Sequence, residues 1–311
     1  MQFILKAFQE IEGLGAASGL VYQHPRLYLI SDYSSYLYCY DLDEIKLHKL
    51  ALFDDSREVI PKPEKFDFEA LLQYDNALLL LGSGSTQRRN TGVRYNLAGS
   101  PDNERSANSK PRQYDLSALY QKFKHTAQLS KSELNIEGAI YHQGQWLFFQ
   151  RGNGEQAQNG IFVVQGNLFQ RADWQVNTLD KAGFQDENIQ HAEILDASHP
   201  VEFVPVQLPV INQVTSGFTD AILVEQTIYF LATAENSSST YHDGEVLGSY
   251  IGCMDINTKT VQDVQLISTC HKFEGLTLYH KAPHKLEFLL CEDNDTEQLN
   301  TTIYKLTLPL E

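Results

Sequence analysis

Acidic and hydroxyl side chains recur in one short motif along this chain of 311 residues. In each copy a polar residue is followed by a small residue and then by an apolar run typical of a β-strand. Oxygen-bearing side chains of this kind are the ligands that hard cations prefer. The polar residues of the five copies are Ser18, Glu69, Glu137, Asp220 and Glu274, with Thr219 as a possible substitute for Asp220.

If these five residues meet on one narrow axis, their carboxylates repel one another and raise each other's pKa. A bound cation would remove that cost. Ca²⁺ accepts about six to eight oxygen ligands in flexible geometry, whereas Mg²⁺ requires a stricter octahedron, so we expect Ca²⁺ rather than Mg²⁺. The alternative is that each motif only caps its strand through hydrogen bonds to neighbouring backbone amides.

A second polar residue follows the next apolar run in every copy. In an antiparallel hairpin the end of the second strand lies beside the start of the first, so we expect both polar sets on one face. The acids Asp32, Glu235 and Glu292 are candidate catalytic bases. Arg151 is the candidate catalytic residue that holds an anion. The full second set is Asp32, Ser83, Arg151, Glu235 and Glu292.

Two loops add candidates for substrate binding. Arg88 and Arg89 in "STQRRNTGVR" form a basic patch, and a phosphate or carboxylate would fit between these arginines and a metal ion. His242 in "YHDGEVLGS" is a candidate substrate-binding residue that could also act as a base or as a second metal ligand. The alternatives are arginines that balance local acids in solvent and a polar turn without a role in binding.

The elements that must position these residues follow the same repeat. Each motif leads through a short turn to a second apolar strand and through a polar loop to a third, and an outer fourth strand is plausible in most copies. The same distance separates Ser18 from Asp32, Glu69 from Ser83 and Glu137 from Arg151. Five such units predict an all-β fold, a five-bladed β-propeller of four-stranded sheets around a channel.

The ends of the chain predict how the ring closes. The last copy stops after its third strand, and the N-terminal "MQFILKAF" would supply the fourth strand of that blade. A six-bladed ring is the alternative, with the sixth copy inside residues 166–215. We expect a single domain over residues 1–311 with insertions near 98–130 and 166–199. The first insertion includes a helix over 115–126, with Asp115 as a possible N-cap.

Composition limits the classes of partner. The formal net charge of −16 repels phosphate backbones and anionic membranes, so we expect neither nucleic acid nor membrane as a partner. The N-terminal stretch lacks the pattern of a signal peptide, and no segment is long and apolar enough to span a membrane. The four cysteines have scattered spacings, which predicts buried free thiols and a cytoplasmic location. The sequence does not indicate an oligomeric state.

The motifs and their order resemble those of the calcium-activated nucleotidases, or soluble apyrases, which are five-bladed propellers with a Ca²⁺ ion in the channel. The resemblance implies that Ser18 and the three glutamates of the ring hold the ion, with Thr219 or Asp220 in the fourth blade. It also implies a role for Asp32 in hydrolysis. The likeness rests on "SGLVY" at 18–22, "LYLISD" at 27–32, "FEAL" at 68–71, "NIEGA" at 135–139, "QWLFFQRGN" at 145–153, "SGFTDA" at 216–221 and "KFEGL" at 272–276.

The chain departs from that family around the expected nucleotide. Asp32 is followed by Tyr33 rather than a second aspartate, "GSGST" replaces a lysine–glutamate–tryptophan run, and Arg151 has no adjacent second arginine. The Glu-Gly-Leu strand starts are also similar to esterase-like propeller domains associated with phytase. We therefore expect a metal-dependent hydrolase of a small phosphorylated or other anionic ester. The alternative is a non-enzymatic propeller that binds a ligand or protein and has a structural metal.

Overall fold

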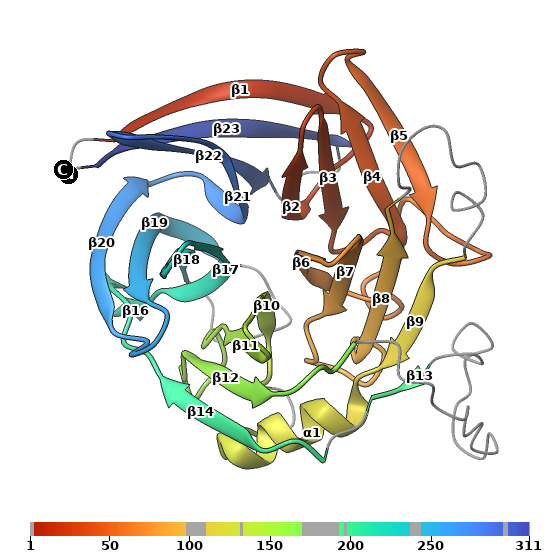
Figure 1. Cartoon of the computed structure of the whole chain (residues 1–311), viewed down its shortest axis with the longest axis vertical. Coiled ribbons are helices and arrows are strands. Elements are labelled where there is room, and N and C mark those ends of the chain that lie inside the picture. Colours follow the sequence, from red (N-terminus) through yellow and green to blue (C-terminus); the bar gives the residue numbers. More distant parts are fainter. Residues whose placement is uncertain are drawn as a thin grey trace.

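Five antiparallel sheets stand around a central axis in the computed structural model, as Figure 1 shows. The structure describes residues 3–97, 110–130, 133–169, 193–195, 198–236, 244–294 and 298–310. The innermost strands contact one another in a closed ring, so the five-bladed propeller is confirmed and the six-bladed alternative is wrong.

Each blade is a sheet whose strands follow one another from the channel outward. From the inside outward, blade 1 consists of β2 (Ala17–Gln23), β3 (Arg26–Ser31), β4 (Tyr36–Asp41) and β5 (Lys46–Ala51). Blade 2 consists of β6 (Phe68–Tyr74), β7 (Ala77–Gly82), β8 (Thr91–Asn96) and β9 (Arg112–Asp115), and blade 3 of β10 (Ile136–His142), β11 (Gln145–Gln150), β12 (Gly160–Gln165) and β14 (Val201–Pro205). Blade 4 consists of β17 (Gly217–Val224), β18 (Thr227–Asn236), β19 (Glu245–Asp255) and β20 (Val261–Ser268), and blade 5 of β21 (Lys272–Ala282), β22 (Lys285–Asp293), β23 (Asn300–Pro309) and β1 (Ile4–Glu12).

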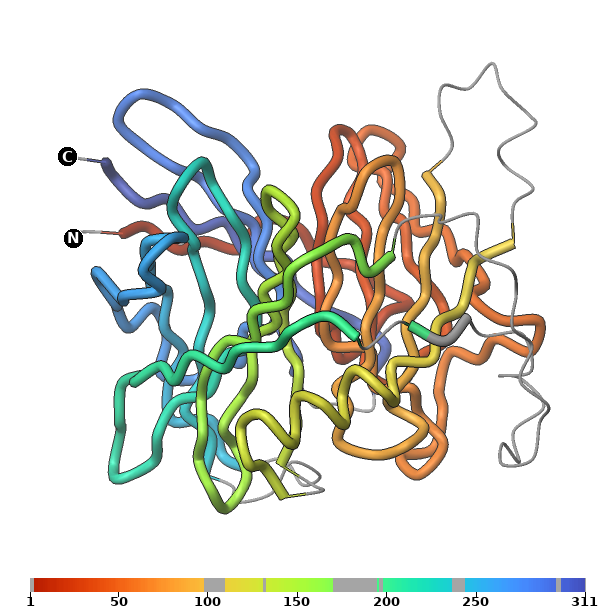
Figure 2. The backbone as a smooth tube through the Cα atoms, turned by 60° about the horizontal axis from the view of Figure 1, so that its bottom comes forward, coloured from red at the N-terminus to blue at the C-terminus, as the bar shows by residue number. Residues whose placement is uncertain are grey.

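The N-terminal strand closes the ring as predicted. β1 pairs antiparallel with β23, from Ile4 opposite Thr307 to Glu12 opposite Asn300. Figure 2 shows these first and last strands side by side at the edge of the molecule. Because the outer strand of blade 5 comes from the other end of the chain, opening the ring requires breaking a full β ladder.

The hydrophobic core is divided among the spaces between neighbouring blades. The run of four leucines in β7 shows why: Leu78 and Leu80 face blade 1, whereas Leu79 and Leu81 face blade 3. Side chains alternate across a strand, so a strand that is buried on both faces must be apolar throughout. The continuous apolar runs of the sequence are therefore the middle strands of blades.

A β-bulge interrupts the inner strand of every blade at the motif residue. The pairing of each inner strand with the second strand skips one residue, which leaves the ladder and changes the direction of its side chain. The skipped residues are Ser18, Glu69, Glu137, Thr219 and Glu274. The fourth member of the ring is thus Thr219, whereas Asp220 pairs regularly with Leu231.

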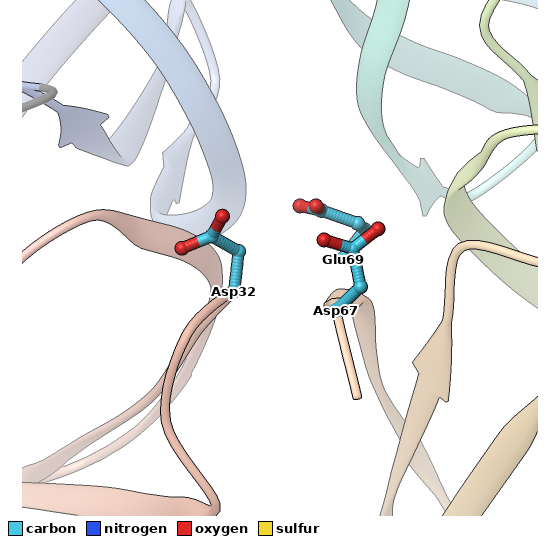
Figure 3. Close-up of side chains that lie close together, drawn as sticks. All are labelled: Asp32, Asp67 and Glu69. Carbon is cyan, nitrogen blue, oxygen red and sulfur yellow. The ribbon is translucent and has the colours of Figure 1, made fainter. Parts of the chain in front are cut away.

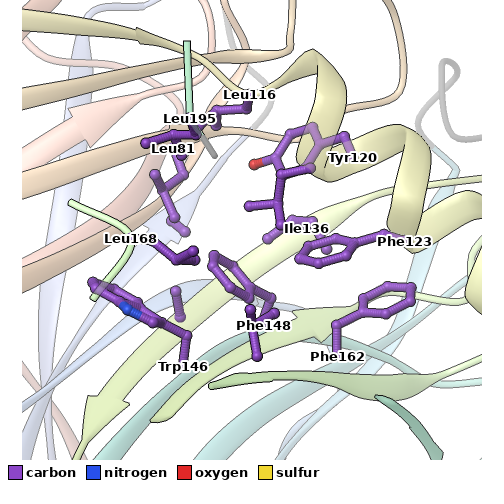
Figure 4. Packing of buried hydrophobic residues seen from close by; sticks show 14 of the residues in the cluster. Leu81, Leu116, Tyr120, Phe123, Ile136, Trp146, Phe148, Phe162, Leu168 and Leu195 are labelled. Atoms are coloured by element: carbon purple, nitrogen blue, oxygen red, sulfur yellow. The ribbon is translucent and has the colours of Figure 1, made fainter. Parts of the chain in front are cut away.

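The predicted helix is present as α1 (Ser117–Thr126), and it covers the gap between blades 2 and 3. Its buried face carries Tyr120 and Phe123, and the Phe123 ring stacks on Phe162 with centroids 4.3 Å apart (Figure 4). The N-cap is Leu116 rather than the predicted Asp115, although the Asp115 carboxylate accepts a hydrogen bond from the Ser117 N–H (2.8 Å) at the start of the helix. Two residues of the second insertion, Glu193–Ile194, form β13 beside β9, while 170–192 and 196–197 lie outside the described residues.

The four cysteines are free, as predicted, but only two of them are buried. Cys39 and Cys291 are buried, Cys253 is partly buried and Cys270 is exposed. The expectation of four buried thiols is therefore wrong for Cys253 and Cys270. Within the described ranges, no helix combines the length and apolar character needed to cross a bilayer.

Candidate functional site

A polar pocket lies at the end of the channel where the inner strands begin. Its volume is about 420 Å³, counted with its open mouth. Every described residue that lines it is charged or carries an amide, and none of them is apolar or aromatic. The lining residues are Asp32, Lys62, Lys65, Asp67, Glu69, Arg89, Asn135, Glu137, Arg151, Asn153, Lys272, Glu274 and Asp293.

The three glutamates of the predicted ring line this pocket, and the two hydroxyl residues connect neighbouring blades. The Ser18 hydroxyl donates to the Phe68 carbonyl (2.6 Å), and the Thr219 hydroxyl donates to the Phe273 carbonyl (2.7 Å). Each acceptor directly precedes a ring glutamate of the next blade. Both hydroxyls are buried, and their hydrogens are used in these bonds while their lone pairs remain.

Asp220, which we predicted as a metal ligand, does not line the pocket. Its carboxylate accepts hydrogen bonds from the backbone N–H groups of Ala221 and Leu276, both at 2.7 Å. Leu276 belongs to the inner strand of blade 5, so Asp220 links blades 4 and 5. Burial raises the pKa of Asp220 well above its usual value, although these two hydrogen bonds oppose the shift. Asp220 therefore accepts hydrogen bonds from backbone amides, as the alternative to metal binding predicted.

Replacing Asp220 by alanine is expected to lower the free energy of unfolding by about 1–3 kcal/mol, because two buried amides lose their acceptor. Urea denaturation measures this change. Asp220→Asn, which keeps one oxygen acceptor, should lose less. An alanine variant as stable as the parent would contradict the assigned role.

The pocket also contains buried cations that we did not predict. Lys65 binds Asp32 and lies 2.9 Å from Asp67, and Lys272 lies 3.0 Å from Glu274 and 2.9 Å from Asp293. Burial opposes the charge of Lys65, but its two aspartates outweigh burial and raise its pKa.

The sequence contains a pattern that could have identified several of the pocket residues that we did not predict. Asp67, Asn135 and Lys272 each stand two residues before a ring glutamate, in "DFE", "NIE" and "KFE". These positions lie where the inner strands begin, at the mouth of the channel, and all three residues line the pocket. Lys62 and Lys65 come from the loop before β6 and have no such spacing.

Arg151 is the central cation of the site. Its guanidinium lies 3.2 Å from Glu137, 3.5 Å from Glu274 and 2.6 Å from Glu235. The side chain is buried, and Gly217 of the next blade provides its space, because a Cβ there would lie 2.5 Å from Arg151 Cγ. Arg89 is paired in the same way with Asp67 at 2.7 Å.

Negative charge remains in excess after these pairings. Among the described residues, six carboxylates and five cations line the pocket, and Glu235 behind Arg151 makes seven carboxylates, so the formal charge of this set is −2. In the part of the chain that the structure describes, the Glu69 carboxylate makes no hydrogen bond or ion pair, although it interacts electrostatically with Lys65, and Glu137 Oε2 is buried without a partner. Burial is the main cause that raises the pKa of Glu69 and Glu274 well above the usual value and that of Glu137 to about 7.

A compact acidic group lies on one side of this pocket. One carboxylate oxygen from each of Asp32, Asp67 and Glu69 lies within 4.8 Å of the others (Figure 3). Lys65 already binds the first two, so a cation placed among all three would compete with its ammonium group. Burial raises the pKa of Asp32, and its Oδ1 atom has no hydrogen-bond partner.

The remaining predicted residues divide between pocket and periphery. Arg89 lines the pocket, but Arg88 lies over the Phe66 ring at 4.8 Å. Glu292 points away and binds His271 Nδ1 (2.6 Å) and the Tyr304 hydroxyl (3.0 Å). Our placement of Glu292 in the second polar set is corrected by one residue, since its neighbour Asp293 lines the pocket. His242 lies outside the described residues.

Comparison with known proteins supports the fold and leaves the activity open. The model of a family of unknown function (DUF6929) matches residues 13–308. The crystal structure of the major Malassezia sympodialis allergen Mala s 1 is similar in fold, with a TM-score of 0.54, 10% identity and coverage of 95% of this chain and 94% of that chain. The tail fiber of Staphylococcus aureus phage P68 matches at a TM-score of 0.42, with 10% identity over 98% of this chain and 52% of that chain. No curated protein matches significantly.

Proposed function

This chain belongs to the DUF6929 family, and we propose that its propeller binds one divalent cation, Ca²⁺ in preference to Mg²⁺, in the pocket at the channel mouth. The observation that carries this proposal is the formal charge of −2 around Glu137 Oε2, a buried carboxylate oxygen without a partner, in the described part of the chain. One divalent cation would make the cluster neutral. Without it, the buried charges must be relieved by protonation.

The residues that would hold the ion are those of the bulge ring. Glu69, Glu137 and Glu274 line the pocket and would supply carboxylate oxygens. Ser18 and Thr219 are not among the lining residues, but they follow the same bulge pattern and keep lone pairs because they donate their hydrogens to backbone carbonyls. All five donors are oxygens of mixed type, which suits the flexible coordination of Ca²⁺ better than the strict octahedron of Mg²⁺.

Calcium is expected to raise the melting temperature of chelator-treated protein. At a concentration of about 100 times the Kd, binding adds about 2.7 kcal/mol to the free energy of unfolding. Glu137→Gln combined with Glu274→Gln should abolish this response, whereas Glu58→Gln on the surface should leave it unchanged. Parent protein that melts at one temperature with calcium and with chelator would refute the proposal.

Hydrolysis of a small anionic ester is a second candidate function, and Asp32 is the observation that favours it. This carboxylate lines the pocket, has a raised pKa and keeps one oxygen without a partner, so it can accept a proton from water. A bound cation would polarise the substrate oxygen. Since none of the described residues that line the pocket is apolar or aromatic, it favours a compact phosphate or carboxylate ester over a nucleotide, whose base needs such a surface.

A panel of phosphate and carboxylate esters, assayed with calcium or with chelator, tests this second function. Chelator-sensitive turnover that falls at least about tenfold in Asp32→Asn would support Asp32 as the base. If no substrate is turned over while calcium still stabilises the protein, the hydrolase is excluded. The binding function then remains, with the pocket presenting its ion to a small anionic ligand.

A further inference from the structure

Arg151 contacts two of the ring glutamates that would hold a divalent cation, Glu137 and Glu274. Its Nη1 atom donates to Glu137 (3.2 Å) and lies 3.5 Å from Glu274, while Nη2 donates to Glu235 at the shorter distance of 2.6 Å. The guanidinium thus has two sets of partners, two ring glutamates on one side and one outer glutamate on the other. Its Nε atom is buried without a hydrogen bond.

A divalent cation and this guanidinium compete for the same carboxylates. Glu137 Oε1 also accepts a hydrogen bond from Asn135 (2.6 Å), so Arg151 and Asn135 both engage that oxygen while Oε2 has no partner. The divalent cation and the guanidinium also repel each other at short range, because both are positively charged. If a divalent cation weakens the contacts of Arg151 to the ring glutamates, Arg151 can keep its ion pair with Glu235.

Lys272, the other cation at the ring, differs in its partners. It contacts one ring glutamate, Glu274, and is also held by Asp293, which is not part of the ring. Within the described part of the chain, Arg151 alone forms ion pairs with two ring glutamates from one side chain. This span depends on the space left by Gly217.

We propose that Arg151 is a built-in competitor of the divalent cation and that its division between Glu235 and the two ring glutamates determines the calcium concentration at which the pocket fills. This inference rests on the proposed function and names the residue that regulates that site. A stronger ion pair between Glu235 and Arg151 favours binding of the divalent cation to the ring glutamates. Loss of Glu235 favours binding of the Arg151 guanidinium to those glutamates instead.

The variant Arg151→Met/Glu235→Gln tests the inference because it removes one charge of each sign and leaves the formal charge of the pocket unchanged. The midpoint of calcium-dependent thermal stabilisation is the measured quantity. We expect a midpoint at least about tenfold lower than in the parent, because the competing cation is gone, which corresponds to about 1.4 kcal/mol. Circular dichroism verifies that the variant is folded.

Glu235→Gln alone is the matched control with the opposite expectation. It keeps Arg151 and removes its outer charged partner, so the guanidinium should remain on the ring and the calcium midpoint should rise by about threefold or more. This nearly isosteric change also tests the inference if the double variant fails to fold. A loss of packing alone would not move the two midpoints in opposite directions.

Each outcome separates this inference from the proposed function. A lower midpoint in the double variant supports both, and a response in the double variant but not in the parent refutes calcium binding by the parent while supporting competition. Equal midpoints in the parent and both folded variants overturn the inference and leave calcium binding intact. No calcium response in any of the three overturns both.

Discussion

Replacing Lys272 by methionine is expected to lower the free energy of unfolding by about 3–5 kcal/mol, the usual cost of removing one partner from a buried ion pair. The lysine is buried between Glu274 and Asp293, at 3.0 and 2.9 Å, and both carboxylates would lose an ion pair. Burial opposes the charge of Lys272, but the acids around it raise its pKa well above the usual value, so it stays charged at neutral pH. Denaturant unfolding at pH 7.5 measures the loss.

The double variant Lys272→Met/Asp293→Asn separates charge from packing. It also removes the negative charge of Asp293, which has lost its ion pair with Lys272, so it should be more stable than Lys272→Met alone, although Glu274 still lacks its lysine. Coupling between the two sites is expected because the residues are in direct contact. If Lys272→Met loses less than about 1 kcal/mol, the pair contributes no more than a surface salt bridge.

Stability in the presence of chelator is expected to fall as the pH rises from 5 to 8. The pKa of Glu137 is raised to about 7 in the folded protein, mainly by burial, with Arg151 opposing the shift. Below its unfolded pKa, near 4.5, both states carry the proton and the difference vanishes. Between the two values only the folded state keeps the proton, so stability is lost with rising pH, by about 3 kcal/mol in all. Above about pH 7 the loss is complete.

Melting temperatures at pH 5, 6, 7 and 8 check this dependence. Glu137→Gln removes the titrating group and should flatten the curve relative to the parent. Since the whole chain carries a formal charge of −16, general repulsion also favours lower pH, and only the difference between parent and variant reports on Glu137. Parallel curves for the two proteins would contradict the assignment. Calcium should stabilise the parent most at the higher pH values, where Glu137 is ionised.

Much of the fold could be predicted because its signals are local and repeated. The alternation that puts Leu78 and Leu80 on one face and Leu79 and Leu81 on the other is read directly from a continuous apolar run between turns. Five copies of such a hairpin indicated the number of blades. The missing fourth strand of the last copy indicated that the N-terminal strand closes the ring.

The candidate site was predictable only for residues in the repeat. Glu69, Glu137 and Glu274 lie in the pocket because the motif places each of them at the start of an inner strand. The choice between Thr219 and Asp220 depended on the position of a bulge, which follows from how blade 4 meets blade 5, since Asp220 binds the Leu276 amide across that interface. A shift of one residue on a strand moves a side chain to the other face, and for the same reason Asp293 replaced Glu292.

The sequence by itself therefore determined the number of blades, the closure of the ring and the three glutamates, since each depends on periodicity along one segment. Only the tertiary structure decided which charges surround those glutamates. Lys65, from the loop before β6, binds Asp32 of blade 1, and Arg151 lies against Gly217 of blade 4; neither contact follows from spacing. The energy of a buried carboxylate depends on all charges within a few ångströms, whatever their distance along the chain, so the balance of −2 appears only when the blades are assembled.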